Sequence, residues 1–255
     1  MINLPGEIAK NYISIGKKKA AMSSDKVFVL AVMAGMFIAL AGCGALAASC
    51  TISGSAGKLV GALVFPAGLT LVLLAGSELF TGNCLLIIPV LEQEIMVSAM
   101  VKNWVIVYLG NFAGSVLIAW MAVASHQLNL YDGKLTAMVM ETAAAKVSLS
   151  FFDAFLRGIL CNLLVCLAVW VSFAAKDAAG KVIALFYPIA VFVVCGFEHS
   201  VANMFYCPAG LFAMADPFYG AAAGLDVSGL TWGSFLIRNL LPVTLGNMAG
   251  GAGLV

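Results

Sequence analysis

The sequence predicts an all-α integral membrane protein, with six transmembrane helices arranged as two inverted halves. Its composition is the first reason, because 63% of the residues are hydrophobic and only 10% are charged. The mean hydropathy is +1.06, whereas soluble domains carry about 25% charged residues. We therefore expect the lipid bilayer to be a partner. No basic face lies outside the first 26 residues, so we expect no nucleic-acid partner.

Six apolar segments are the second reason, because a helix needs about 20 apolar residues to span a bilayer. The second and fifth are too long for one straight span, and glycine and polar residues interrupt both, so we predict that these two helices are broken. The predicted spans are approximately Val27–Ala48, Leu59–Leu91, Ala99–Ala124, Phe152–Ala175, Val182–Ala213 and Leu230–Val255.

Repeated motifs are the third reason. KNWVIVYLGNFAG (102–114) aligns without gaps to RNLLPVTLGNMAG (238–250), and GSELFTGN (76–83) aligns to GFEHSVAN (196–203). A weaker match pairs Gly35 with Gly158. Three spans are an odd number, so the second half must run inverted relative to the first, a 3+3 arrangement found in membrane transporters.

These limits divide the chain into four parts. Residues 1–26 form a polar, amphipathic arm, 27–125 the first three-helix repeat, 126–151 an external connection and 152–255 the second repeat. The arm carries five lysines, which predicts cytoplasmic N- and C-termini by the positive-inside rule. The seven cysteines include no C-x-x-C pair, and neither H-E-x-x-H nor G-x-S-x-G occurs. We expect no cofactor, no metal and no catalytic residues.

The two breaks hold acids and asparagines where apolar residues would normally continue. Breaking a helix frees backbone groups, and each unsatisfied group costs several kcal/mol in hydrocarbon. Glu78 and Glu198 are expected to accept from freed N–H groups at a half-helix N-terminus, and handling protons is their alternative role. Asparagines can bridge freed backbone in the same way, but we favour a role as polar contacts between helices. They are Asn83, Asn203, Asn111 and Asn247.

The breaks differ in one respect, because the first offers Thr81 and the second offers His199. An ionisable residue inside a membrane is a functional candidate by default, although a lone buried histidine is often an ordinary core residue. Apolar residues crowd both breaks. They are core or lipid-facing residues, or hydrophobic constrictions if they face a pore. The group comprises Phe65, Leu69, Leu79, Phe80 and Phe192.

Five motifs together resemble the formate/nitrite transporter family over nearly the whole chain. They are GSELFTGN, KNWVIVYLGNFAGS, LCNLLVCLAVW, GFEHSVANMF and NLLPVTLGNMAGG. The resemblance implies a bacterial inner-membrane homopentamer in which each protomer has an aquaporin-like inverted repeat and its own pore. It implies transport of small monovalent anions such as formate, nitrite and hydrosulfide. The break reads E-L-F-T-G, where relatives often have D-L-F-T-S. In its overall look the chain resembles a separate branch of the family, the hydrosulfide channels.

The resemblance also implies roles for individual residues. Thr81 and His199 meet at the pore centre, where the anion is transiently protonated. Lys146 draws anions toward the pore mouth, unless it is an ordinary headgroup-facing lysine, and Asn162 is a polar pore-lining residue. The two constrictions would be formed by Phe65, Leu69, Leu79, Phe80, Val165 and Phe192.

An aquaporin-type channel for water or neutral solutes is the alternative, although the chain has no Asn-Pro-Ala turn. A membrane enzyme is a second alternative.

Overall fold

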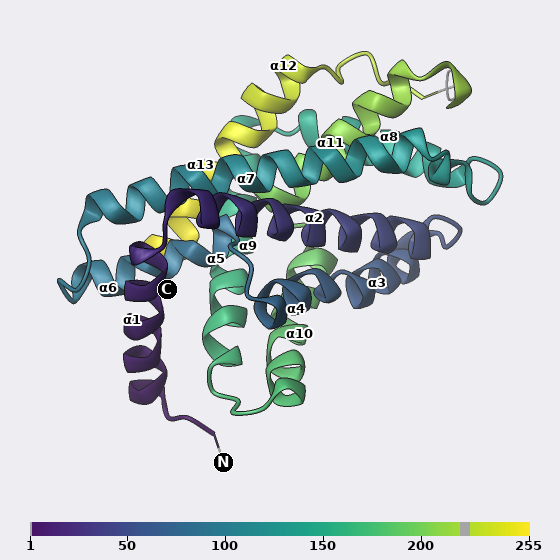
Figure 1. Ribbon diagram of the computed structural model, residues 1–255. Helices are drawn as coiled ribbons and strands as arrows, with labels where there is room; N and C mark the ends of the chain where they lie inside the picture. Colours follow the sequence, from purple (N-terminus) through teal and green to yellow (C-terminus); the bar gives the residue numbers. More distant parts are fainter. Residues whose placement is uncertain (1, 220–224) are drawn as a thin grey trace.

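The computed structural model describes residues 2–219 and 225–255 and is built from helices (Figure 1). The α-helices are α1 (Pro5–Ala21), α2 (Ser24–Ser49), α3 (Gly54–Val64), α4 (Pro66–Ala75), α5 (Phe80–Asn83), α6 (Ile87–Leu91), α7 (Val97–Ala124), α8 (Lys134–Val147), α9 (Phe151–Ser172), α10 (Ala178–Cys195), α11 (Ser200–Ala215), α12 (Trp232–Ser234) and α13 (Leu241–Met248). Short 3-10 turns are η1 (Cys84–Leu86), η2 (Gln127–Asn129) and η3 (Pro217–Tyr219), and π-helical turns are η4 (Phe235–Leu240) and η5 (Ala249–Gly253).

Five helical segments of the described chain are long and apolar enough to cross a membrane, which confirms the predicted all-α membrane class. They are Ser24–Ser49, Gly54–Ala75, Val97–Ala124, Phe151–Ser172 and Ala178–Cys195. The sixth predicted span is helical over residues 232–253, but it consists of four short consecutive pieces. Pro242 explains part of this, because proline has no N–H and its ring clashes with the carbonyl four residues earlier. The π-helical turn η4, which is wider than an α-helical turn, lies just before Pro242.

Both predicted breaks are present, and each begins at a glycine. Gly76 ends α4 with φ of 72°, and Gly196 ends α10 with φ of 68°. This left-handed conformation is favourable only for glycine and terminates a helix without strain. The chain is then extended until α5 begins at Phe80 and α11 begins at Ser200. The two interruptions are therefore encoded locally by the sequence.

The predicted connection 126–151 contains a helix, α8, that the sequence analysis did not distinguish. Its apolar residues Leu135, Val139, Met140 and Ala143 are buried. They pack against α11 and neighbouring helices, and Figure 1 shows α8 lying along the bundle beside α11. This packing places the end of α8, and with it Lys146, next to the second break.

Close packing of α2 on α7 and of α9 on α13 holds the frame around the breaks. A Cβ on Gly114 in α7 would overlap the Val32 carbonyl, and a Cβ on Gly246 in α13 would overlap the Phe155 carbonyl. These glycines thus let two helix backbones touch, as small residues commonly do between membrane helices.

We expect Gly114→Ala to destabilise the protein by about 1–3 kcal/mol, because the added methyl must push α7 away from the α2 backbone. Thermal unfolding of the purified protein in detergent measures the loss. Gly6→Ala is the matched control, since no heavy atom lies within 4 Å of a Cβ built on Gly6. Equal melting temperatures for the two variants would contradict this account of the α2–α7 contact.

Candidate functional site

The two breaks bring Thr81 and His199 together in the interior. Thr81 Oγ1 lies 2.9 Å from His199 Nε2, and the two residues are 0% and 3% exposed. His199 Nδ1 accepts the backbone N–H of Ala202 at 3.0 Å. Because a backbone N–H can only donate, Nδ1 carries no proton, and the neutral ring donates from Nε2 to the threonine oxygen. The Thr81 hydroxyl hydrogen then remains available to a further acceptor.

One asparagine clamps each break by the same three hydrogen bonds. Asn111 Oδ1 accepts from the Phe80 N–H at 2.8 Å, and its Nδ2 donates to the carbonyls of Glu78 at 2.9 Å and Ala31 at 2.7 Å. Both atoms of the amide group are thus used to satisfy backbone groups that the break frees. Asn111 therefore bridges freed backbone and also joins α7 to α2, so it fills both of the roles considered for it.

Asn247 repeats the pattern at the second break. Its Oδ1 accepts from the Ser200 N–H at 2.9 Å, and its Nδ2 donates to the carbonyls of Glu198 at 2.9 Å and Gly158 at 2.8 Å. Gly158 therefore occupies the place that Ala31 has in the first half. The weak sequence match of Gly158 with Gly35 was wrong, because it ignored the contacts that each helix makes with its break.

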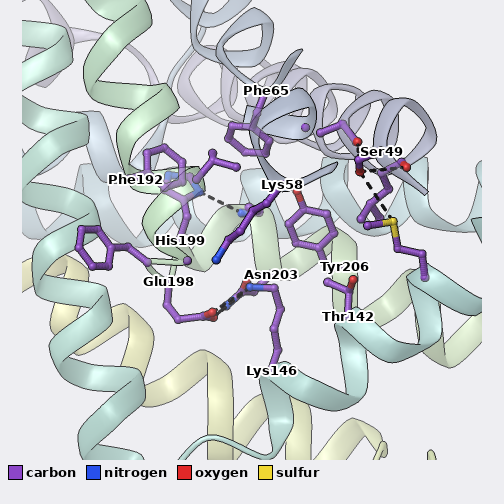
Figure 2. Close-up of a pocket in the computed structure, with 18 residues that line it drawn as sticks. Ser49, Lys58, Phe65, Thr142, Lys146, Phe192, Glu198, His199, Asn203 and Tyr206 are labelled. Carbon is purple, nitrogen blue, oxygen red and sulfur yellow. Dashed lines mark hydrogen bonds and ion pairs between the residues drawn. The ribbon is translucent and has the colours of Figure 1, made fainter. Parts of the chain in front are cut away.

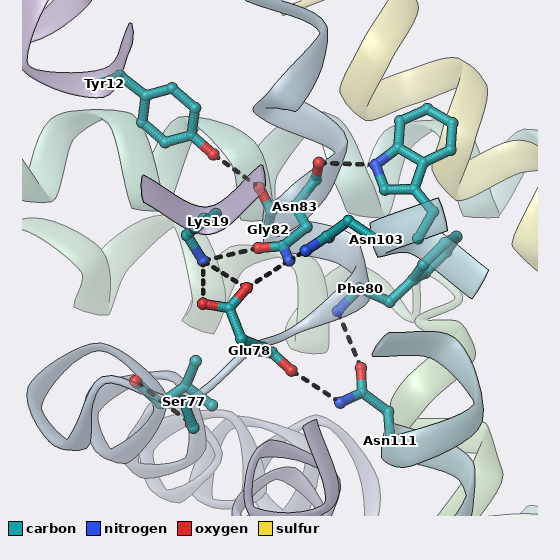
Figure 3. A network of polar contacts seen from close by, with 11 residues as sticks. Tyr12, Lys19, Ser77, Glu78, Phe80, Gly82, Asn83, Asn103 and Asn111 are labelled. Carbon is teal, nitrogen blue, oxygen red and sulfur yellow. Dashed lines mark hydrogen bonds and ion pairs between the residues drawn. The ribbon is translucent and has the colours of Figure 1, made fainter. Parts of the chain in front are cut away.

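The Glu78 carboxylate is held by side chains rather than by freed backbone N–H groups (Figure 3). Lys19 Nζ lies 2.8 Å from both carboxylate oxygens, and Asn83 Nδ2 donates to one of them at 2.6 Å. Asn83 Nδ2 also donates to Asn103 Oδ1 at 2.9 Å. This differs from the expectation that the glutamate would accept from the new helix N-terminus, because Asn111 already fills that role.

The Glu198 carboxylate has an equivalent set of partners. Lys146 Nζ donates to its two oxygens at 3.0 and 3.1 Å, and Asn203 Nδ2 donates at 2.7 Å. Asn203 Nδ2 also donates to Asn239 Oδ1 at 2.7 Å. The side chains of Lys146 and Glu198 are 14% and 6% exposed, so this ion pair is mostly removed from water. Each half therefore contains one buried lysine–glutamate pair beside its break.

Sequence reasoning missed Lys19, Asn103 and Asn239. The asparagines were visible in the aligned segments 102–114 and 238–250, where each follows the basic residue. Lys19 was read only as part of a polar arm. The carbonyls of Leu30 and Arg157 occupy equivalent places, because they accept from the N–H groups of Glu78 and Glu198. The sequence distance from Lys19 to Leu30 equals the distance from Lys146 to Arg157. Extending the alignment into the arm would have found Lys19.

Two cavities lie beside the breaks, one at each break. The larger, of about 230 Å³, is lined by Phe65, Phe192, Lys146 and His199, among others (Figure 2). The Phe192 ring stacks on the His199 ring with centroids 5.9 Å apart, and Phe65 meets Phe192 edge-on at 5.6 Å. These aromatic rings form an apolar wall next to the histidine.

The smaller cavity, of about 40 Å³, lies on the side of the first break. Leu69 and Leu79 line it together with Lys19 and Asn83. Both leucines are 2% exposed. Each cavity thus combines one polar network with apolar side chains, and His199 lines the larger one while Gly82, next to Thr81, lines the smaller one.

Four of the residues named from the resemblance line neither of these two cavities, and one of them is Thr81, which contacts the cavity-lining His199. Phe80 packs edge-on against the rings of Trp104 and Tyr108. Val165 is 1% exposed in the core. Asn162 donates from Nδ2 to the Asn247 carbonyl at 2.7 Å, so it holds the α13 backbone.

A helical membrane protein with two broken helices meeting at a buried polar pair, with a cavity at each break, has the construction of a channel or transporter. The profile of the formate/nitrite transporter family matches residues 6–255. The chain belongs to the formate/nitrite transporter family, which confirms the resemblance. It is a membrane transport protein and not an enzyme.

Named relatives agree with this assignment. A probable formate transporter of Methanothermobacter thermautotrophicus is 39% identical over 97% of this chain and 92% of its own length. The formate channel FocA of Escherichia coli K12 is 37% identical over 99% of this chain and 91% of its own length. A solved structure, described as a pentameric formate channel with formate bound, superposes with a TM-score of 0.80 at 35% identity, covering 91% of this chain and 94% of that one. Nothing in these comparisons supports the aquaporin-type alternative.

Proposed function

We propose that this chain forms a homopentameric channel in a bacterial cytoplasmic membrane, with one pore per protomer, for small monovalent weak-acid anions. Formate is the foremost candidate, because relatives named as formate channels or transporters match almost the whole chain. Nitrite and hydrosulfide belong to the same chemical class. The likeness to a pentameric channel supports the assembly. Both termini lie in the cytoplasm, and the six spans form a 3+3 inverted repeat.

The Thr81–His199 pair, with one cavity at each break, is the observation that carries the proposal. A bare anion crosses a dry apolar passage only at great cost, because burying an unpaired charge is unfavourable by many kcal/mol. The free Thr81 hydroxyl hydrogen offers a hydrogen bond to an anion that enters from either cavity. The apolar surroundings then favour the neutral acid, which moves past Phe192 on one side and Leu79 on the other.

We assign the proton to water in the cavities and a polarising role to His199. In the geometry described, Nδ1 is already an acceptor and Nε2–H donates to Thr81. A neutral imidazole that gave up its Nε2 proton would become an anion, which is unfavourable in this setting. The balanced step transfers one proton from hydronium to the anion, which leaves water and the neutral acid. His199 orients the threonine hydroxyl toward the permeating species.

Flux measurements in proteoliposomes test the proposal. We expect formate to pass and to pass faster at the lower of two pH values, because protonation becomes easier as pH falls. Nitrite and hydrosulfide are the competing substrates, and chloride, the anion of a strong acid, is excluded. If glycerol passes and none of the weak-acid anions does, the protein is a neutral-solute channel, and Thr81 and His199 act as a filter for uncharged molecules.

A further inference from the structure

A third cation, Lys58, faces the larger cavity from the first turns of α3. It lines the same cavity as Lys146, Glu198 and His199. Figure 2 shows its side chain reaching across the cavity toward the segment that carries Glu198 and His199. Its Nζ lies 3.1 Å from the position that a Cβ on Gly196 would take. The ammonium group therefore sits at the second break itself.

The charges around this cavity do not contribute equally. Lys146 lies within 3.0 Å of the Glu198 carboxylate and is mostly buried, so the two form a neutral pair. A neutral pair produces only a short-range field, because the two charges cancel at a distance. Within residues 2–219 and 225–255, Lys58 has neither an ion pair nor a hydrogen bond to another side chain. Since the His199 ring is neutral in this geometry, Lys58 gives the cavity its net positive charge.

Lys58 also lies next to a helix end of opposite partial charge. Gly196 is the C-terminal cap of α10, and the C-terminal end of a helix carries a partial negative charge. The residue as a whole is exposed, so the ammonium keeps contact with water. A hydrated cation can exchange its water for an anion without first breaking an ion pair, which Lys146 cannot do.

We propose that Lys58 captures the permeating anion in the larger cavity, and that the Lys146–Glu198 pair holds the break in shape. This inference rests on the proposed anion channel and names the charge that concentrates its substrate. A charged cavity raises the local concentration of an oppositely charged ligand and speeds its entry, and salt suppresses the effect. Lys58 acts before the anion reaches Thr81, so it alters the capture step and not the passage past Phe192.

The test compares Lys58→Gln, Lys58→Arg and Lys134→Gln in proteoliposomes. Lys134 is the matched control, because it is an exposed lysine at the start of α8 and does not line this cavity. In Figure 1 the α2–α3 and α7–α8 connections, which adjoin the two lysines, lie at the same end of the molecule. Both substitutions to glutamine therefore remove one positive charge at that end. Formate influx is measured against formate concentration at two ionic strengths.

We expect Lys58→Gln to lower influx at subsaturating formate by about fivefold when ionic strength is about 0.01 M, and by less than twofold at about 1 M. Saturating influx should stay unchanged, Lys58→Arg should match the unmodified protein, and Lys134→Gln should lose less than twofold. Equal behaviour of Lys58→Gln and Lys134→Gln overturns the inference. So does a loss that Lys58→Arg shares at both ionic strengths, since that marks a packing role. If the unmodified protein passes no anion, the proposed function itself fails.

Discussion

Replacing Glu198 by alanine should destabilise the protein by about 3–5 kcal/mol, because the substitution leaves the Lys146 ammonium buried without its carboxylate. The Lys146 side chain is 14% exposed, and its Nζ lies 3.0 Å from the carboxylate. The substitution also removes one of the two acceptors of Asn203 Nδ2. Chemical or thermal unfolding of the purified protein in detergent measures the change in the free energy of unfolding.

Glu94→Ala provides the control for this prediction. Glu94 pairs with Lys17 at 2.6 Å, but the two side chains are 43% and 52% exposed. An exposed pair contributes about 0–1 kcal/mol, because water solvates both charges when the contact is lost. A second control, Lys146→Met combined with Glu198→Leu, removes both buried charges and should recover much of the stability that Glu198→Ala loses. If Glu198→Ala is as stable as Glu94→Ala, the buried pair does not stabilise the second break.

Removing the hydroxyl of Thr81 should lower formate flux by about 10–100-fold. A hydrogen bond to a charged group contributes about 1.5–3 kcal/mol, and each 1.4 kcal/mol corresponds to about a tenfold change in rate. Thr81→Val keeps the shape of the side chain and removes its only donor. His199→Phe should give a loss of similar size, because the threonine hydroxyl loses the group that orients it. Proteoliposome flux at two pH values measures both effects.

Thr70→Val is the matched control for Thr81→Val. Its hydroxyl donates to the Pro66 carbonyl one turn earlier in α4, whereas the Thr81 hydroxyl meets His199. The control should conduct as well as the unmodified protein. If Thr81→Val and Thr70→Val conduct equally, the pore centre lies elsewhere. Unchanged flux through His199→Ala at every pH would remove His199 from the mechanism.

The sequence alone identified the breaks and their polar residues because the signals there are local. A glycine and a nearby acid within an apolar stretch predict an interrupted membrane helix, and this prediction does not depend on contacts with distant parts of the chain. The approach of Thr81 to His199 was expected only through the resemblance. No local pattern tells which side chains from two distant breaks meet, because the packing of several helices determines that contact.

Contacts that the sequence did not predict join residues that lie far apart in the chain. Phe80 follows directly after Leu79, yet the two side chains face different surroundings, because α5 begins between them and turns the phenylalanine toward Trp104 and Tyr108. The arm was read as a separate polar segment because its composition differs from the spans. Its Lys19 nevertheless completes the network around Glu78, a contact that spans 59 residues of sequence.

The order of the charged partners along the chain has a consequence for biogenesis. In both halves the lysine precedes its glutamate, as Lys19 precedes Glu78 and Lys146 precedes Glu198. A ribosome synthesises the chain from its N-terminus, so each cation is already made when its carboxylate emerges. Each carboxylate therefore enters the membrane after its cationic partner has been synthesised. The short helices α1 and α8 thus deliver the neutralising group ahead of the segment that would otherwise be the hardest to insert.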